Sequence, residues 1–295
     1  MVTGSTLPQV LGDAEFVANY ENNSPEWLAL RREGFGGSEV ATCLGLNPWE
    51  SAVTLWYKRT NRIDSEIADN PAMEWGRRLE PVVMAKFKEA HPELEIWDNV
   101  GTWRNKNRPW QLVNPDGIYR DPEGNYGIIE IKTAAYKDDW AFGVPKYYKT
   151  QVQYYLNAFG FDNAHVALLV AGRDYDSYEL PADDFQQAVD LAAVERFLKC
   201  VEDDEQPAWD GSNSTYETVR KVHPEIENTE VELGQLYESY KEAKRAANNA
   251  NEYLTLIKTQ ILDLMGLAKN GVYQKKVVLT RTAKGQGLPY LLEKR

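Results

Sequence analysis

Apolar positions along this chain repeat either every three to four residues, as in helices, or every second residue, as in strands. Before residue 94 the helical spacing dominates. Ser24-Pro25 and Asn70-Pro71 each combine a capping side chain with a proline suited to the first turn, so both predict a helix start. Pro81 lies within the second of these helices and is expected to kink or restart it. Shorter helices are expected from Ser38 and from Ser51.

The pattern between residues 94 and 133 is shorter and alternating, which is typical of β-strands. Turn-forming residues separate four expected strands, which we interpret as a meander: 94–97, 100–104, 111–120 and 126–133. The strong turn Asp121–Asn125 joins the last two. The remaining core elements are expected to be a helix at 147–159, strands at 164–170 and 175–180, and an amphipathic helix at 181–200.

The C-terminal third begins with a segment rich in Pro, Gly, Ser and Asn, residues 206–214, which predicts a linker. Residues 229–267 then show a long helical pattern with apolar positions three and four apart, and residues 272–282 resemble a hairpin. We therefore expect an N-terminal lead at 1–23, a core at 24–205 and a helical arm with a hairpin at 206–295.

Composition supports a folded domain, because 43% of the 295 residues are hydrophobic. No apolar run reaches the length of a membrane span, and residues 1–23 lack the features of a signal peptide, so we expect a soluble cytoplasmic protein. Cys43 and Cys200 lie far apart without metal-binding spacing, and the three histidines are scattered. Catalysis, if present, should therefore depend on carboxylates.

The net charge of −12 argues against a nucleic-acid partner, since phosphate binding is driven by Lys and Arg. The charges are unevenly distributed, however. Acidic residues concentrate in 183–204 and 225–232, whereas many basic residues lie in the first half of the chain. A basic cleft on an acidic body is therefore compatible with this composition.

Glu130 and Lys132 alternate with Ile129 and Ile131, which places a carboxylate and an ammonium on one face of the expected strand. Asp116 precedes the strand that the Asp121–Asn125 turn brings back beside it, so Asp116 and Glu130 can converge. Two hard oxygen ligands suit Mg²⁺ or Mn²⁺. Taken singly, each residue is equally compatible with an ordinary role: a cross-strand charge pair for Glu130 and Lys132, a turn cap for Asp116.

Two helices add polar candidates to this set. Glu80 follows Gly76-Arg77-Arg78 on the expected helix. It is also compatible with a place on an ordinary solvated, charged face of that helix. Gln151 and Tyr154 lie three apart on another helix and so share a side. The order in which these elements follow one another is much rarer than any one of them: a helical Glu, then Asn-Pro-Asp-Gly, then an apolar Glu-x-Lys strand, then Gln-x-x-Tyr.

This order resembles the PD-(D/E)xK nucleases, and within them the lambda-exonuclease-like, YqaJ-type phage recombination nucleases. The resemblance spans roughly residues 27–170 and depends on six motifs: Trp27–Arg31, Gly37-Ser38-Glu39, Gly76 with Glu80, Asn114–Gly117, Glu130-Ile131-Lys132 and Gln151–Tyr154. It implies an α/β restriction-endonuclease-like core, in which helices flank a mixed central sheet, with a C-terminal long helical arm and a β-hairpin.

The resemblance also implies roles for the candidates. Asp116, Glu130 and the Ile131 backbone carbonyl would bind Mg²⁺, with Mn²⁺ as a substitute, while Glu80 supports the metal and Lys132 orients the attacking water. Gln151 and Tyr154 would position the scissile phosphate or the lysine.

Arg31 and Ser38 would hold a terminal 5′-phosphate, since Arg offers a bidentate fork and Ser38 starts a helix. Without the resemblance, Ser38 is equally a cap and Arg31 a surface charge. Four tryptophans are candidates either for stacking on unpaired bases or for core packing: Trp49, Trp56, Trp75 and Trp140.

The resulting hypothesis is a Mg²⁺-dependent 5′→3′ exonuclease acting on linear double-stranded DNA ends and leaving 3′ single strands for a single-strand annealing protein. Self-association, for instance as a trimer, is compatible with the helical arm, which could equally bind the annealing partner. Two alternatives stay open. One is an endonuclease of the same fold, and the other is a non-catalytic module that binds DNA ends.

Overall fold

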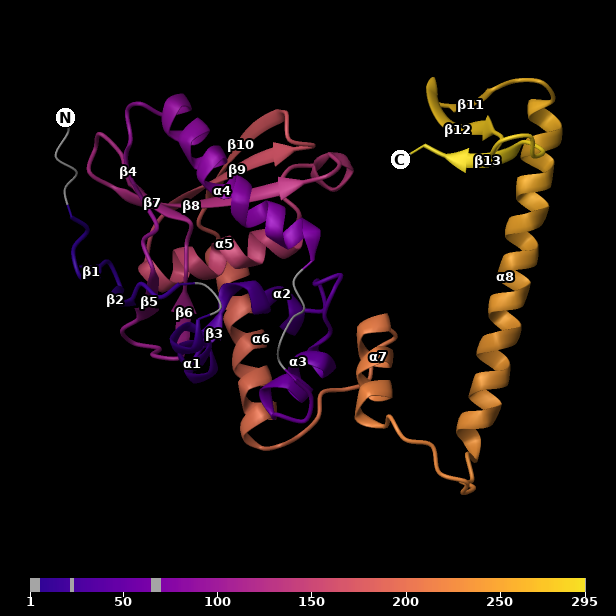
Figure 1. The fold of residues 1–295 in the computed structure, drawn as a ribbon, viewed down its shortest axis with the longest axis horizontal. Helices are drawn as coiled ribbons and strands as arrows, with labels where there is room; N and C mark the ends of the chain where they lie inside the picture. The colour runs from indigo at the N-terminus through magenta and orange to yellow at the C-terminus, as the bar shows by residue number, and fades with distance from the viewer. Residues whose placement is uncertain (1–5, 22–23, 65–69, 295) are drawn as a thin grey trace. The chain divides into compact units, whose positions relative to one another are not determined.

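The computed structural model describes residues 6–21, 24–64 and 70–294 (Figure 1). The chain divides into two compact units, residues 1–225 and 226–295. Each unit is described by itself.

The first unit contains a mixed five-stranded sheet in the order β10-β9-β8-β7-β4. Its central strands β8 and β9 are parallel, and the other pairs are antiparallel. The alternation predicted for 126–133 is confirmed, and it separates the apolar residues of β8 between two cores. Ile129 and Ile131 belong to the core formed with α4, whereas Ile128 belongs to the larger core that includes α5. The strands are β4 (Glu95–Asp98), β7 (Gly117–Arg120), β8 (Tyr126–Ala134), β9 (Asn163–Val170) and β10 (Asp174–Pro181).

A second five-stranded sheet has the order β1-β2-β5-β6-β3. The meander expected between residues 94 and 133 is therefore wrong. β5 and β6 pair with each other and join this second sheet, whereas β4 pairs with β7 in the first. The strands are β1 (Val10–Leu11), β2 (Ala14–Ala18), β3 (Phe35–Gly36), β5 (Thr102–Asn105) and β6 (Gln111–Val113). β2 pairs with β5, so residues 10–18 form part of the core unit rather than a separate lead.

Capping side chains start the predicted helices. Ser24 accepts a hydrogen bond from the Trp27 N–H at the start of α1, and Asn70 accepts one from Met73 at the start of α4. α4 continues through Pro81 without restarting. The helix expected from Ser38 is a 3-10 turn, Gly37–Glu39, followed by the short α2. The helices of this unit are α1 (Pro25–Glu33), α2 (Val40–Cys43), α3 (Ala52–Arg59), α4 (Pro71–Ala90), α5 (Lys146–Phe159), α6 (Asp184–Glu202) and α7 (Asn213–Val222).

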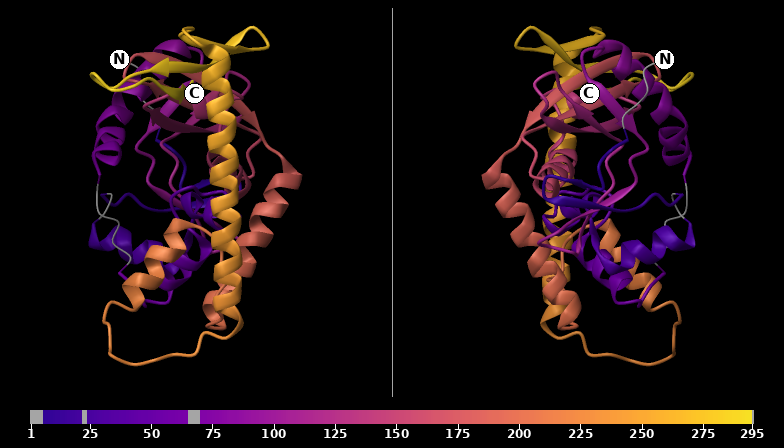
Figure 2. Two further views of the ribbon diagram at one scale, coloured as in Figure 1. Left: turned by 90° about the vertical axis from the view of Figure 1, so that its right-hand side faces the viewer. Right: turned by 90° about the vertical axis from the view of Figure 1, so that its left-hand side faces the viewer.

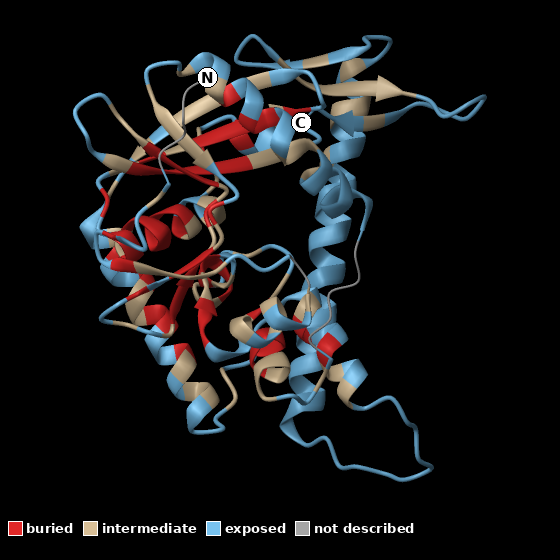
Figure 3. Cartoon of the chain, turned by 60° about the vertical axis from the view of Figure 1, so that its left-hand side comes forward, coloured by how far each residue is buried: buried red, intermediate tan, exposed pale blue. Residues whose placement is uncertain are grey.

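The first unit extends past the boundary expected at residue 205. The hydroxyl of Thr54 on α3 forms hydrogen bonds of 2.8 Å with the hydroxyls of both Ser214 and Thr218 on α7. Because these groups satisfy one another in a buried layer, the segment predicted as a linker leads into a helix packed on the core. Figure 3 shows that buried residues concentrate in the two sheets and in α5.

The second unit contains α8 (Gln235–Met265) and a small antiparallel sheet in the order β11-β12-β13 (Figure 2). The expected helical arm and hairpin are confirmed, and a third strand extends the hairpin. The strands are β11 (Asn270–Tyr273), β12 (Lys276–Thr282) and β13 (Tyr290–Glu293). Among the described residues, no helix has both the length and the apolarity that a membrane span needs.

Candidate active site

The predicted carboxylate and ammonium of β8 are in direct contact. Lys132 Nζ donates to Glu130 Oε1 at 2.6 Å, and Gln151 Nε2 on α5 donates to the same oxygen at 2.8 Å. Glu130 is only 2% exposed. A buried carboxylate is stable only when other groups compensate it, and here one ammonium and one amide do so.

Asp116 joins this group through the antiparallel pairing of β7 and β8, in which Gly117 lies opposite Ile129. Two residues beyond Ile129 on β8, the Ile131 main-chain N–H donates to Oδ2 of Asp116, the residue before Gly117, at 2.6 Å. The N–H and C=O of a residue in an extended strand face the same neighbouring strand. The Ile131 carbonyl therefore faces the side on which Asp116 lies, as a main-chain metal ligand would require.

Glu80 lies on α4, which packs against β8. Burial and the charge of Asp116 raise the pKa of Glu80 to about 7, although Lys132 acts in the opposite direction. The charges of Asp116 and Lys132 therefore both act on the Glu80 carboxyl group, and its supporting role stays a prediction.

The three carboxyl groups of Glu80, Asp116 and Glu130 outnumber the single ammonium of Lys132 in this buried site. Burial, followed by the charge of Asp116, raises the pKa of Glu130 to about 8, and burial also raises the pKa of Asp116. Burial alone would lower the pKa of Lys132, but Glu130 and Asp116 outweigh it and raise that pKa. Lys132 thus stays charged, and one ammonium faces three carboxyl groups.

The residues present fit a divalent metal. Glu130 Oε2 is buried and has no hydrogen-bond partner within the described part of the chain, so it is an acceptor without a donor. No three His, Cys, Asp or Glu side chains among the described residues converge as a complete ligand set. Two carboxylates and one carbonyl would leave the other positions to water, as is usual for Mg²⁺.

The structure separates Tyr154 from this group. Its buried hydroxyl donates to the Phe35 carbonyl at 2.8 Å, in the second sheet. The neighbouring Tyr155 takes the expected place, because Gln151 Nε2 also donates to the Tyr155 hydroxyl at 3.0 Å. Residues three and four apart on a helix share a side, so Tyr155, four residues after Gln151, fits the helical spacing as well as Tyr154 does.

Arg31 and Ser38 come together as predicted. Arg31 Nη2 donates to Ser38 Oγ at 3.2 Å and lies 3.5 Å from Glu39 Oε2. Sequence reasoning missed Arg59, whose Nη2 pairs with the same Glu39 oxygen at 2.6 Å. Burial opposes ionisation of Glu39, but Arg59 and Arg31 outweigh it and lower its pKa. Arg59 thus forms a closer ion pair with Glu39 than Arg31 does.

Gly37 connects the Arg31–Ser38 pair to the carboxylates. A Cβ at position 37 would lie 2.4 Å from the Tyr155 ring, so only glycine allows this approach. Tyr155 in turn bonds Gln151, which bonds Glu130. The two predicted sites therefore meet along α5.

An aromatic ring lies against the lysine. Lys132 Nζ lies 4.8 Å from the centroid of the Tyr148 ring, a cation–π arrangement. Of the four candidate tryptophans, Trp56 and Trp140 are buried and serve the core. Trp49 and Trp75 are 67% and 60% exposed and remain accessible.

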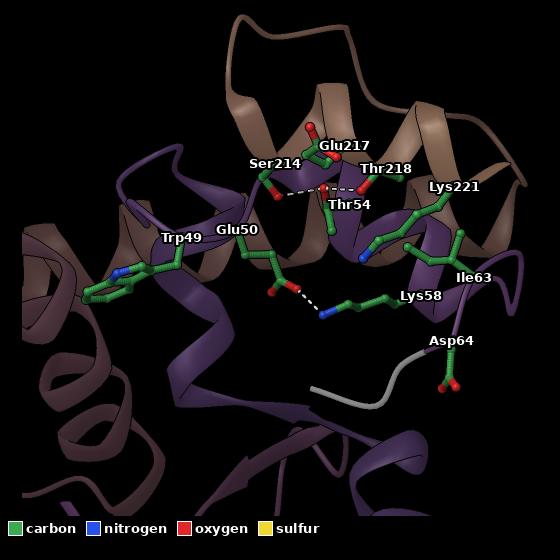
Figure 4. A pocket seen from close by; sticks show the side chains of 10 residues that line it. All are labelled: Trp49, Glu50, Thr54, Lys58, Ile63, Asp64, Ser214, Glu217, Thr218 and Lys221. Carbon is green, nitrogen blue, oxygen red and sulfur yellow. Dashed lines mark hydrogen bonds and ion pairs between the residues drawn. The ribbon is translucent and has the colours of Figure 1, made fainter. Parts of the chain in front are cut away.

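A separate hollow lies between α3 and α7 (Figure 4). Several of its polar groups bond one another: Lys58 pairs with Glu50 at 2.6 Å, and Thr54 bonds the hydroxyls of Ser214 and Thr218 on α7. The candidate tryptophan Trp49 lines it, whereas the predicted carboxylates, Lys132 and the Arg31–Ser38 pair do not. It is the polar joint between the two helices.

Comparison with known proteins gives two relatives in sequence. The uncharacterized protein YqaJ of Bacillus subtilis is 32% identical over 268 residues, which cover 87% of this chain and 78% of that protein. Protein D345L of African swine fever virus is 30% identical over 101 residues, which cover 33% of this chain and 28% of that protein.

Among solved structures, an alkaline exonuclease from Laribacter hongkongensis superposes with a TM-score of 0.52 at 21% identity. The match covers 68% of this chain and 99% of that structure, and it establishes a shared α/β fold. The YqaJ-like viral recombinase domain matches residues 26–162, which include every residue of the candidate site. The chain belongs to the YqaJ-like viral recombinase family.

Proposed function

We propose that this protein is a metal-dependent nuclease that digests linear double-stranded DNA from its 5′ ends. Family and fold both support a nuclease. The observation that carries the proposal is the meeting of Asp116 and Glu130 at Ile131, beside a charged lysine. Three carboxyl groups, one of them with a buried acceptor oxygen, are poorly suited to a purely structural role.

In this proposal Asp116, Glu130 and the Ile131 carbonyl hold Mg²⁺ or Mn²⁺, and Glu80 supports them by its charge. When bound, the metal supplies an activated water and neutralises charge on the phosphate. Lys132 orients the attacking water and stabilises the developing negative charge. Gln151 fixes Glu130 Oε1, which leaves Oε2 for the metal.

The proposed direction depends on Arg31 and Ser38 as the site for a terminal 5′-phosphate. Arg59 forms the shorter of the two ion pairs with Glu39. The Arg31 guanidinium therefore keeps hydrogen-bonding capacity for a ligand. Ser38 is exposed beside it. The path from Gly37 through Tyr155 to Glu130 gives this pair a fixed relation to the carboxylates.

The product would be a 3′ single strand for an annealing protein in the cytoplasm of a bacterium or of a phage-infected host. The exposed Trp49 and Trp75 are the candidates for stacking on the separated strand.

The test is digestion of linear duplexes that carry either a 5′-phosphate or a 5′-hydroxyl, with Mg²⁺, Mn²⁺ or EDTA. We expect metal-dependent loss of the 5′-phosphorylated strand, slower digestion of the 5′-hydroxyl duplex, and an intact closed circular plasmid. Cleavage of the circle would instead favour the endonuclease. Binding of DNA ends without degradation under any metal would favour the non-catalytic module.

A further inference from the structure

The small sheet of the C-terminal unit is basic, although the chain as a whole is acidic. Residues 266–295 contain seven Lys and Arg and one acidic residue, Glu293, whereas the net charge of the chain is −12. Among the described residues, no ion pair involves the five exposed lysines of this segment: Lys269, Lys275, Lys276, Lys284 and Lys294. Uncompensated cations gathered on one small unit favour a polyanionic ligand.

One face of this sheet lies against α8. Gly271 of β11 lies opposite Leu279 of β12, and a Cβ at Gly271 would lie 3.4 Å from Sδ of Met265, the last residue of α8. Arg281 shares the face of Leu279 and donates to the Gly266 carbonyl at the end of the helix. α8 therefore covers this face, and the opposite face, called the open face below, is free within the described part of this unit (Figure 1).

The open face carries two exposed tyrosines. Tyr273 lies opposite Lys276 and Tyr290 opposite Thr282, and side chains directly opposite each other on antiparallel strands share a face. Lys276 and Thr282 alternate with Leu279 along β12, so all four side chains lie on the side away from α8. The tyrosines are 66% and 47% exposed. Because six residues of β12 separate their partners, the two rings lie roughly 20 Å apart along the strand.

The same face carries cations and no acid. Lys276 lies on it directly, and the Lys294 N–H donates to the Val278 carbonyl at 2.9 Å, which continues the β12–β13 pairing. Val278 alternates with Leu279, so Lys294 also lies on the open face. Glu293 lies opposite Leu279 and therefore on the face toward α8. Nothing acidic on the open face competes for the two lysines.

This combination of rings and cations on an open sheet indicates the kind of ligand. Lysines bind backbone phosphates, and exposed aromatic rings stack on bases, which only an unpaired strand presents. We infer that the open face binds single-stranded DNA, with Lys276 and Lys294 on phosphates and Tyr273 and Tyr290 stacked on bases. The binding site is separate from the nuclease centre. The choice of DNA, and of the 3′ strand that digestion would leave, rests on the proposed function.

The first test measures binding of the full chain to a 5′-hydroxyl oligothymidylate of about 20 nucleotides by fluorescence anisotropy in EDTA. These conditions remove the metal and the 5′-phosphate, so the result does not depend on catalysis. Tyr273→Ala with Tyr290→Ala should raise the Kd at least about tenfold, because both stacking contacts are lost. The matched control, Tyr237→Ala with Tyr253→Ala, removes two exposed tyrosines of α8 and should bind as the wild type does. An unchanged Kd in the first variant overturns the proposal.

The second test concerns the lysines. Lys276→Gln with Lys294→Gln should reduce the slope of log Kd against log salt concentration by about 1.4, because two phosphate contacts are lost. The control Lys241→Gln with Lys244→Gln removes equal charge from α8, where Lys241 already pairs with Glu238 at 2.7 Å, and should keep the wild-type slope. Equal slopes in all three proteins would exclude phosphate contacts by the open face.

The third test needs no variant. Photo-cross-linking of the wild type to an iodouridine-substituted single strand, followed by peptide mapping, should label Tyr273 or Tyr290. Cross-links confined to the first unit, or equal binding of a duplex through the same tyrosines, overturn the proposal. Digestion of a linear duplex is measured separately. A wild type that binds the strand through these residues but digests no DNA would contradict the proposed function and leave the binding site standing.

Discussion

The main-chain N–H of Ile131 donates to Asp116 Oδ2 at 2.6 Å, so the aspartate is fixed by the strand that carries Glu130 and Lys132. One pleated strand thereby places the two candidate side chains Glu130 and Lys132 on one face and directs a main-chain group to a third residue, Asp116. The site depends on the β7–β8 hairpin, to which α4 adds Glu80 and α5 adds Tyr148, Gln151 and Tyr155.

Asp116→Asn should weaken metal binding without unfolding the protein. The asparagine keeps an oxygen for the Ile131 N–H but loses the charge that a metal ligand needs. Titration calorimetry with Mn²⁺ should show affinity at least about tenfold weaker than in the wild type. Glu123→Gln, an equal charge change on the exposed turn of the same hairpin, should bind Mn²⁺ as the wild type does. Equal affinity in all three proteins would remove Asp116 from the metal site.

Tyr148→Leu should slow the reaction through Lys132. The ring lies 4.8 Å from the ammonium, and loss of such a contact costs about 0.5–2 kcal/mol, which corresponds to roughly a two- to thirtyfold lower kcat. Tyr148→Phe keeps the aromatic face and should retain most of the wild-type kcat, whereas KM should change little in both variants. If Phe and Leu lowered kcat equally, the aromatic face would have no part in positioning Lys132.

Gly37→Ala should destabilise the fold, because the added methyl would lie 2.4 Å from the Tyr155 ring. We expect a decrease of about 1–3 kcal/mol in the free energy of unfolding, measured with urea. Gly211→Ala is the matched control, since nothing lies within 4 Å of a Cβ there. A Gly37→Ala variant as stable as that control would show that the ring moves aside freely.

Asp190 on α6 makes stability depend on pH. Burial raises its pKa from 3.8 to about 6, although Gln186 donates to it. Between these values the folded state binds more protons than the unfolded state, so the free energy of unfolding contributed by this group falls as pH rises from about 4 to about 6.

Asp190→Asn removes that dependence. Between pH 4.5 and pH 7.5, the free energy of unfolding of the variant should rise by about 1 kcal/mol relative to that of the wild type. Comparing the two pH values cancels any constant effect of the new amide. Asp184→Asn, exposed on the same helix, should show no such gain. A difference between variant and wild type that is flat with pH would exclude a raised pKa at Asp190.

The residues of β8 were predictable because their information is local. Period-two alternation places Glu130 and Lys132 on one face of the strand. The Asp121–Asn125 turn brings the preceding strand back antiparallel beside it and so sets which residues of the two strands lie opposite each other. Both depend on neighbours within a few residues, which the sequence displays directly.

The division of the strands into two sheets was not predictable in this way. β5 and β6 have the same short, alternating texture as β4 and β7, and their partners are set by tertiary contacts. Gln111, for example, is buried and donates to the Tyr154 carbonyl on α5. Arg59 escaped notice for a similar reason, since its partner Glu39 lies 20 residues away.

The segment before α7 shows the limit of composition. Residues 206–214 have the Pro, Gly, Ser and Asn content of a linker. Ser214 and its neighbour Thr215 nevertheless form hydrogen bonds with hydroxyl groups at the start of α3, in a buried layer. Ser214 bonds Thr54, and Thr215 Oγ1 donates to Ser51 Oγ at 2.7 Å. Polar side chains that satisfy one another can form a packed joint, and composition alone does not distinguish this from an exposed connection.

Asp116, just before β7, and Glu130 on β8 form the proposed metal-dependent nuclease centre. The most direct measurement compares digestion of a 5′-phosphorylated linear duplex by the wild type and by Glu130→Gln across a Mg²⁺ titration. We predict degradation by the wild type only with Mg²⁺, and a rate at least on the order of a hundredfold lower for the variant at every Mg²⁺ concentration. Equal rates for the two proteins, or undiminished digestion in EDTA, would contradict the account.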